Sequence, residues 1–183
     1  MDRALPRAVL DSSVLVPAWS RLVLADLATA RSDRPARYTP IWCEWIIAES
    51  WRVLTIRRLR RQPAFSRADE RQLARSANVM LTMLLQVMEL VSTVPPFEST
   101  WSTASDADDR PVWTAAVRSN AQFVVSHNIH HFPPRDANGL CAFRGIEFIT
   151  AANFIAEVLS LDLDALAQYP IPPAWRLTHQ RRL

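Results

Sequence analysis

The sequence from Asp106 to Pro133 reads D-A-D-D-R-P-V-W-T-A-A-V-R-S-N-A-Q-F-V-V-S-H-N-I-H-H-F-P. It places three carboxylates within its first four residues and continues with a helical pattern that ends at residues 119–120. The run from Phe123 to Val125 is short and apolar, as a buried strand is. The stretch therefore predicts a helix that leads into a strand, the basic unit of an α/β fold.

The acidic residues of this stretch suit the beginning of a helix. The carboxylate of Asp106 or Asp108 can accept hydrogen bonds from free N–H groups of the first turn, and Pro111 fits an early position that needs no donor. The helical residues expected to face the core are Val112, Ala115, Ala116 and the following Ala121. Asp109 then lies near the helix start, while Ser126 and Asn128 lie just past the strand, where parallel α/β sheets collect ligands and metals.

An apolar segment near the N-terminus also ends in an acidic residue. R-A-V-L-D-S-S-V-L predicts a buried strand from Ala8 to Leu10, followed by Asp11, a turn, and a helix from about Pro17. Taken alone, Asp11 is most simply explained as the cap of the next helix.

Residues 41–54, I-W-C-E-W-I-I-A-E-S-W-R-V-L, predict a helix that is apolar around most of its circumference and therefore mostly buried. Glu44 and Glu49 are five residues apart, so they project about 140° from one another and cannot both address one site. A buried carboxylate needs a cation of some kind. For Glu49 this is either Arg52 or Arg57, in a salt bridge, or an ion in a functional site.

Several further patterns complete the expected order of elements. The run R-R-L-R-R, Arg57 to Arg61, is either a solvated helix end or a rim that binds phosphate. Residues 66–69 have the form of a capping box that opens a helix to about Leu90. A strand is expected from Ile146 to Ile149, with Thr150 capping a helix after it.

Two motifs, D-x-D-D-R-x-V-x-x-A-A and V-V-S-x-N-x-x-x-F-P, resemble the second half of a PIN domain. This family of metal-dependent ribonucleases includes toxins of the VapC type. The resemblance extends from about Arg7 to Leu159 and implies an α/β fold with three layers, α/β/α, around a central, mostly parallel sheet. It implies one nuclease domain over residues 1–160, which leaves 161–183 as an extension of unknown role.

The resemblance also implies which residues are functional. The implied catalytic residues are Asp11, Glu49, Asp109 and Asn128. The implied ligands of Mg²⁺ or Mn²⁺ are Asp11, Asp109 and Asn128. The candidates for substrate contact are Ser126, Arg57, Arg58, Arg60 and Arg61.

The chain departs from the family at its fourth acid. Many PIN nucleases have an aspartate where this chain has Asn128, and some members that have asparagine there carry an aspartate just before Phe-Pro, where this chain has His131. An amide oxygen can ligate a hard cation without contributing a full charge, so we expect weaker metal binding.

The function implied is a metal-dependent endoribonuclease that acts on single-stranded RNA, as the toxin of a toxin–antitoxin pair with a cognate antitoxin protein. The alternative is a weakly active or inactive PIN-like module that binds RNA or a partner protein. A phosphatase-like hydrolase with Asp11 as nucleophile is less favoured, because Ser13 stands where such enzymes have a second aspartate.

Other residues near the acidic motif have weaker functional interpretations. Zinc bound by His127, His130 and His131 has little support, because no cysteine has a matching spacing; contact with phosphate is the better interpretation. Trp101 and Trp113 flank the motif and are candidates for stacking on bases.

The composition is that of a single soluble domain. The 183 residues are 49% hydrophobic and 21% charged, with a net charge of +3 and no lysine. No apolar run is long enough to cross a bilayer or to form a signal segment, so a cytoplasmic location is expected. Cys43 and Cys141 have no metal-binding or redox spacing and are expected to be reduced and buried. A homodimer is a further possibility.

Overall fold

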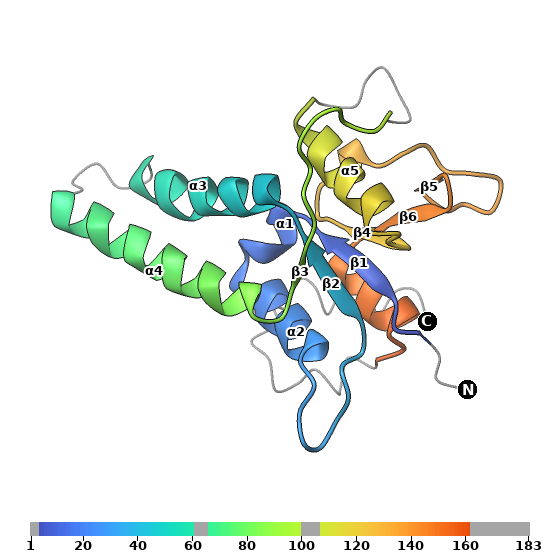
Figure 1. Ribbon diagram of the computed structural model, residues 1–183, viewed down its shortest axis with the longest axis horizontal. Helices are drawn as coiled ribbons and strands as arrows, with labels where there is room; N and C mark the ends of the chain where they lie inside the picture. The colour runs from blue at the N-terminus through green and yellow to red at the C-terminus, as the bar shows by residue number, and fades with distance from the viewer. Residues whose placement is uncertain (1–3, 61–65, 100–106, 162–183) are drawn as a thin grey trace.

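The computed structural model describes residues 4–60, 66–99 and 107–161, and these form an α/β fold (Figure 1). Its elements in chain order are β1 (Arg7–Leu10), α1 (Ser12–Leu15), α2 (Ala18–Ala28), β2 (Thr39–Trp42), α3 (Glu44–Arg60), α4 (Arg67–Leu85), β3 (Glu89–Leu90), η1 (Ala107–Asp109), α5 (Arg110–Arg118), β4 (Phe123–Val125), η2 (Ile129–His131), β5 (Ala142–Phe143), β6 (Ile146–Ile149), α6 (Ala151–Asn153) and η3 (Phe154–Val158).

The sheet has the strand order β3-β2-β1-β4-β6-β5, and only the pairing of β5 with β6 is antiparallel. In the centre, Leu10 of β1 is in register with Val125 of β4, and Val124 with Phe148 of β6. The central strands are short and buried, as strands covered on both faces must be. The mostly parallel sheet expected from the sequence is confirmed.

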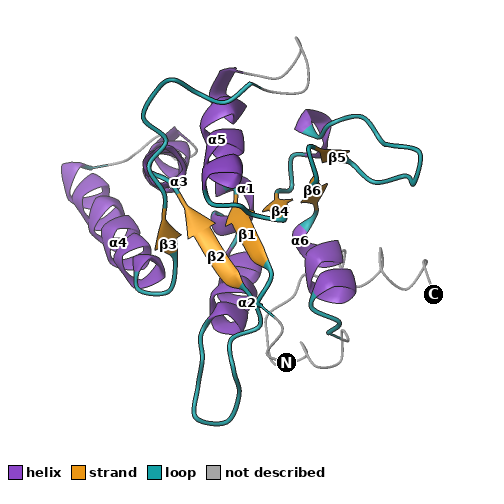
Figure 2. Cartoon of the chain, turned by 45° about the vertical axis from the view of Figure 1, so that its right-hand side comes forward, coloured by secondary structure: helices purple, strands orange, loops and turns teal. Residues whose placement is uncertain are grey.

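Helices cover both faces of the sheet, which gives the three layers (Figure 2). On one face, the Tyr38 ring packs edge-on against Phe154, with centroids 5.1 Å apart, and its hydroxyl donates to the carbonyl of Leu24 in α2 at 2.9 Å. On the other face, Trp113 of α5 packs against Phe148 of β6, with centroids 6.2 Å apart. The predicted core residues of α5 are all buried.

Strand β2 was not expected, because Ile41 and Trp42 were assigned to a helix. They are completely buried beside β1, and the helix begins only at Glu44. The prediction that this helix is mostly buried is also wrong: Trp45 and Trp51 are exposed. Periodicity cannot separate a buried strand from the helix that follows it when both are apolar.

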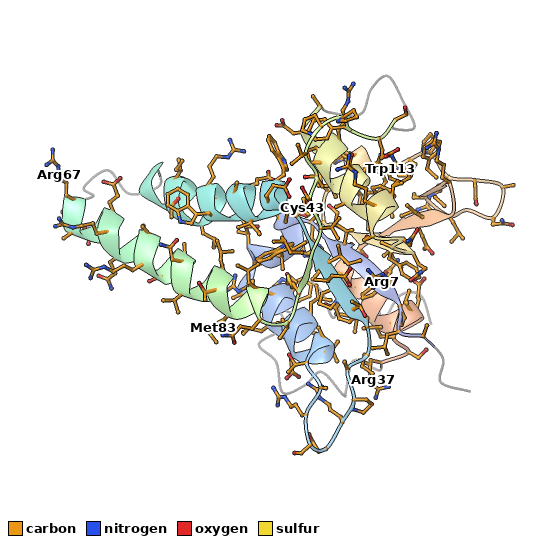
Figure 3. All side chains as sticks on the ribbon, viewed as in Figure 1. Arg7, Arg37, Cys43, Arg67, Met83 and Trp113 are labelled. Carbon is orange, nitrogen blue, oxygen red and sulfur yellow. The ribbon has the colours of Figure 1, made fainter. Side chains whose placement is uncertain are left out.

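Helix α4 starts as predicted but ends early. The Ser66 hydroxyl accepts a hydrogen bond from the backbone N–H of Asp69, and the Asp69 carboxylate accepts one from the backbone N–H of Ser66. The helix ends at Leu85, and the last residues of the predicted helix form strand β3 beside β2. The α3–α4 pair extends away from the sheet (Figure 1), and Figure 3 labels Met83 on α4. Met83 is 64% exposed.

In the described part of the chain, no helix combines the length and hydrophobicity needed to cross a membrane. Both cysteines are free; Cys43 is buried as expected, whereas Cys141 is only partly buried.

Candidate active site

The four residues expected to be catalytic line one cleft, of about 490 Å³, at the C-terminal edge of the sheet. Asp11 directly follows β1, and Glu49 lies in the second turn of α3, which starts just after β2. Asp109 immediately precedes α5, which packs on the sheet and leads back toward β4. Asn128 follows β4. The parallel topology thus brings together side chains that are distant in sequence.

The carboxylate of Asp11 is oriented by serine hydroxyls. Its Oδ2 accepts hydrogen bonds from Ser13 Oγ at 2.6 Å and Ser126 Oγ at 2.8 Å, and a longer one from the Ser13 backbone N–H at 3.4 Å. Its Oδ1 receives a 3.4 Å contact from the Ser12 hydroxyl. Asp11 is therefore an N-cap, but of α1, which occupies the segment expected to be a turn, and not of the helix expected from about Pro17; it also lines the cleft.

Glu49 is linked to Asp11 through Ser12. The Ser12 hydroxyl donates to Glu49 Oε2 at 2.8 Å, which is its shorter contact. The salt bridge from Arg52 is present, but its N–O distance is 3.9 Å and the arginine is exposed, so its contribution to stability is small. Glu44 lies elsewhere, as expected: its Oε1 accepts hydrogen bonds from the N–H and hydroxyl of Thr93 at 2.8 and 3.1 Å.

Asp109 contacts His131, a pairing that the sequence did not indicate. Its Oδ2 lies 2.6 Å from His131 Nδ1, a bond that joins α5 to the turn after β4. Asp109 occupies the N-cap position of α5 but makes no capping bond with its side chain. Its carboxylate therefore contacts His131 and does not cap α5.

Asn128 lines the cleft, and Ser126 lines a small adjoining pocket together with Asp11, Asp109 and Asn128. Ser126 is buried, and its hydroxyl donates to Asp11, which helps to orient that carboxylate; its contact with substrate stays a prediction. The backbone N–H of Asn128 donates to Ser126 Oγ at 3.0 Å. This bond holds the turn that carries Asn128 against the acid.

His127 also lines the cleft, with its ring 5.4 Å from that of Trp19. Its Nε2 is buried and has no hydrogen-bond partner among the described residues. Burial lowers the pKa of His127, against the opposing effect of the Asp11 carboxylate, so the ring is neutral at pH 7. His130 is exposed and does not line the cleft.

The side chains of the cleft offer the type of ligand atom that a hard divalent cation binds. These atoms are carboxylate and amide oxygens, which Mg²⁺ and Mn²⁺ prefer. Within residues 4–60, 66–99 and 107–161, no three His, Cys, Asp or Glu side chains are close enough together to hold an ion. Mg²⁺ is commonly bound in proteins through one or two carboxylates, with several waters completing its shell. The distances in the described part of the chain give no support to a zinc site built from the histidines.

Among the tryptophans and arginines predicted to contact the substrate, the structure describes the side chain of Trp113. Trp113 is completely buried, and its Nε1 donates to the carbonyl of Ser99 at 2.8 Å, so the prediction that it stacks on bases is wrong (Figure 3). Trp101, Arg61 and the side chains of Arg57, Arg58 and Arg60 lie outside the described residues.

Comparison with known families gives one match: the family model described as PIN domain matches residues 7–130 of the chain. The match covers more than half of the 183 residues, contains Asp11, Glu49, Asp109 and Asn128, and ends one residue before His131. No curated protein and no solved structure matches the chain.

Proposed function

The chain belongs to the PIN domain family, and from this premise we propose that it is a metal-dependent endoribonuclease that hydrolyses phosphodiester bonds in single-stranded RNA. The family has a nuclease-like fold, and its members are generally hydrolases. The observation that carries the proposal for this chain is that Asp11, Glu49 and Asp109, from three distant parts of the sequence, line one cleft together with Asn128.

A cluster of acids suits this chemistry because the scissile phosphate carries negative charge. When bound, Mg²⁺ or Mn²⁺ neutralises part of that charge and makes water a better nucleophile. Asp11, Asp109 and the amide oxygen of Asn128 are the donors that would hold the ion. Ser13 and Ser126 fix the orientation of the Asp11 carboxylate, because both hydroxyls donate to Oδ2.

We assign Glu49 a different role, that of the base that accepts a proton from the attacking water. Its carboxylate is partly buried at the cleft wall, and the Ser12 hydroxyl holds one of its oxygens at 2.8 Å. A general base acts within hydrogen-bond reach of the proton that it removes, which a fixed carboxylate in the same cleft allows. Among the described residues, the other oxygen, Oε1, has only the long contact with Arg52.

We further propose that the protein is the toxin of a toxin–antitoxin pair and acts on RNA in the cytoplasm. The support is its resemblance to VapC-type members of the family. A cognate antitoxin would cover the acidic cleft, where a partner's arginine can occupy the place of the cation. Expression without the antitoxin should arrest growth, and the neighbouring gene should encode a protein that relieves the arrest. Normal growth would contradict the toxin role and leave the nuclease proposal standing.

A second candidate function, a PIN-like module that binds RNA or a partner without cleaving, is favoured by two features. Asn128 contributes no charge, and the Asp109 carboxylate already contacts His131 at 2.6 Å. Both features weaken the attraction of the cleft for a hard cation such as Mg²⁺. Cleavage activity separates the two candidates.

The nuclease proposal is tested by cleavage of a labelled single-stranded RNA with Mn²⁺, with Mg²⁺ and with a chelator. We expect cleavage only with a divalent cation and a loss of roughly 10²-fold or more in Asp109→Asn, because one anionic group of the cleft is removed. Glu44→Gln is the matched control: it also neutralises one acid, but Glu44 binds Thr93 away from the cleft and should retain full activity. Cleavage in chelator, or full activity of Asp109→Asn, contradicts the proposal.

A further inference from the structure

His131 brings an imidazole nitrogen into the acidic cleft. Its ring lines the cleft together with Asp11, Asp109 and Asn128, and Nδ1 lies 2.6 Å from Asp109 Oδ2. The side chain is partly exposed at 37%, so it is accessible from the cleft. An imidazole is a good ligand for transition metals, whereas it adds little for Mg²⁺.

The spacing of this pair is close to that of two ligands on one ion. Two donors that bind a cation at right angles, each about 2.1 Å from it, are about 3 Å apart. The distance between His131 Nδ1 and Asp109 Oδ2 is 2.6 Å. If these two atoms moved a few tenths of an ångström apart, they would have the separation of two ligands of one ion.

The local fold keeps a third donor beside this pair. His131 and Asn128 lie on the same turn, and the backbone N–H of His131 donates to the carbonyl of Asn128 at 3.2 Å. Ser126 in turn anchors that turn to Asp11, because its hydroxyl accepts from the Asn128 N–H and donates to Asp11. The nitrogen, the amide and the carboxylates therefore face one cleft from fixed backbone positions.

We propose that His131 is a ligand of the cation, with Asp109 and the Asn128 amide, and that this donor set makes the site select a transition metal such as Mn²⁺ over Mg²⁺. The inference rests on the proposed function only in that the function requires a cation. With an amide and an imidazole among its donors, the site offers a hard ion less negative charge than a cleft of carboxylates, and the nitrogen compensates only for a transition metal.

The same contact also fits a positioning role, in which His131 only donates a hydrogen bond that orients Asp109. The two roles differ in one observable, which is whether nitrogen is bonded to the metal. Pulsed electron paramagnetic resonance of Mn²⁺ on the full-length protein, without RNA, detects the coupling of the ion to a bonded ¹⁴N nucleus. The experiment uses Mn²⁺ alone as probe and needs no enzymatic activity.

We expect the nitrogen coupling in the wild type and in His130→Ala, the matched control for an exposed histidine that does not line the cleft. The coupling should be lost in both His131→Ala and His131→Asp. His131→Asp restores an oxygen donor, so it should still bind Mn²⁺ while its Mn²⁺/Mg²⁺ affinity ratio, measured by calorimetry, falls roughly tenfold.

Four results would overturn the inference: no binding of Mn²⁺, bound Mn²⁺ without nitrogen coupling, coupling that survives His131→Ala, or an unchanged affinity ratio in His131→Asp. Coupling that is lost instead in His127→Ala would assign the nitrogen to the other histidine of the cleft. RNA cleavage without nitrogen coupling overturns this inference and leaves the nuclease standing. Nitrogen coupling without RNA cleavage would support this inference and contradict the nuclease proposal.

Discussion

Asn128 is a residue of the cleft whose side chain carries no charge, which lowers the total negative charge of the cleft. It lines the same cavity as Asp11 and Asp109. The resemblance of its motif to the family implies that it occupies the position where many PIN nucleases have a fourth acid. An aspartate there would add one negative charge close to the cation, and a close charge pair near a protein surface is worth roughly 4 kcal/mol before desolvation is subtracted.

Asn128→Asp should therefore bind Mg²⁺ and Mn²⁺ at least several-fold more tightly than the wild type, as measured by titration calorimetry. Asn138→Asp is the matched control, because Asn138 is exposed in the loop before β5 and does not line the cleft. Equal affinities of wild type and Asn128→Asp would place the residue outside the shell of the ion.

At the residue scale, the sequence predicted the acids of the cleft better than their partners. Asp11 and Asp109 belong to motifs with fixed places at strand and helix ends, and their meeting follows from the topology. The hydrogen bond from Ser126 to Asp11 and the contact of His131 with Asp109 join segments that are separated in sequence, whereas Ser13 is a near neighbour of Asp11. The signals were present only as a serine pair after Asp11 and a histidine at the position where some family members carry an aspartate.

At the scale of elements, Glu44 ties the start of α3 to the segment after β3. Its carboxylate accepts two hydrogen bonds from Thr93. Although the largest effect, burial, acts to raise its pKa, hydrogen bonds from its own backbone N–H and from Thr93, with the charge of Arg118, together lower it below the usual 4.5.

Since the pKa is lower in the folded than in the unfolded protein, the ionised carboxylate stabilises the fold above pH 4.5, and this contribution is lost as the pH falls through the lowered pKa. Glu44→Gln should thus unfold at lower urea concentration than the wild type at pH 7, and the difference should shrink as the pH falls below 4.5. A difference that is constant from pH 7 to pH 3 would contradict this account.

Most of the long and central elements were predictable, whereas β2 and the two-residue strands were not. Helix α5, β4 and β6 have clear periodicity and turn signals, and the predicted Thr150 cap is present, with its hydroxyl accepting from the Asn153 N–H at 3.3 Å. Strands β3 and β5 have two residues each and exist only because a neighbouring strand offers hydrogen bonds. Local sequence does not encode such a partner.

At the scale of the whole molecule, the strand order explains why the cleft lies where it does. From β1 the chain moves outward to β2 and β3, then returns to place β4 on the other side of β1. In open α/β sheets, ligands bind outside the carboxyl ends of the strands where the direction reverses. Asp11 follows β1 and Ser126 follows β4, so both residues lie at this reversal. Asp109, just before α5, and Glu49, in α3, line the cleft there.

The central claim is that this cleft promotes attack by water on an RNA phosphodiester. The chemistry of the cleaved ends tests it most directly. When water attacks phosphorus and the bond to O3′ breaks, one fragment carries a 5′-phosphate and the other a 3′-hydroxyl. When the RNA's own 2′-hydroxyl attacks, the bond to O5′ breaks, and the fragments carry a 2′,3′-cyclic phosphate and a 5′-hydroxyl.

The decisive measurement is therefore mass spectrometry of the products of a defined single-stranded RNA after incubation with the protein and Mn²⁺. The account predicts 5′-phosphate and 3′-hydroxyl ends in the wild type and loss of these products in Asp11→Asn. Cyclic phosphate ends produced by the purified protein would contradict it, because they would show that the RNA's own 2′-hydroxyl, and not water, attacks the phosphorus.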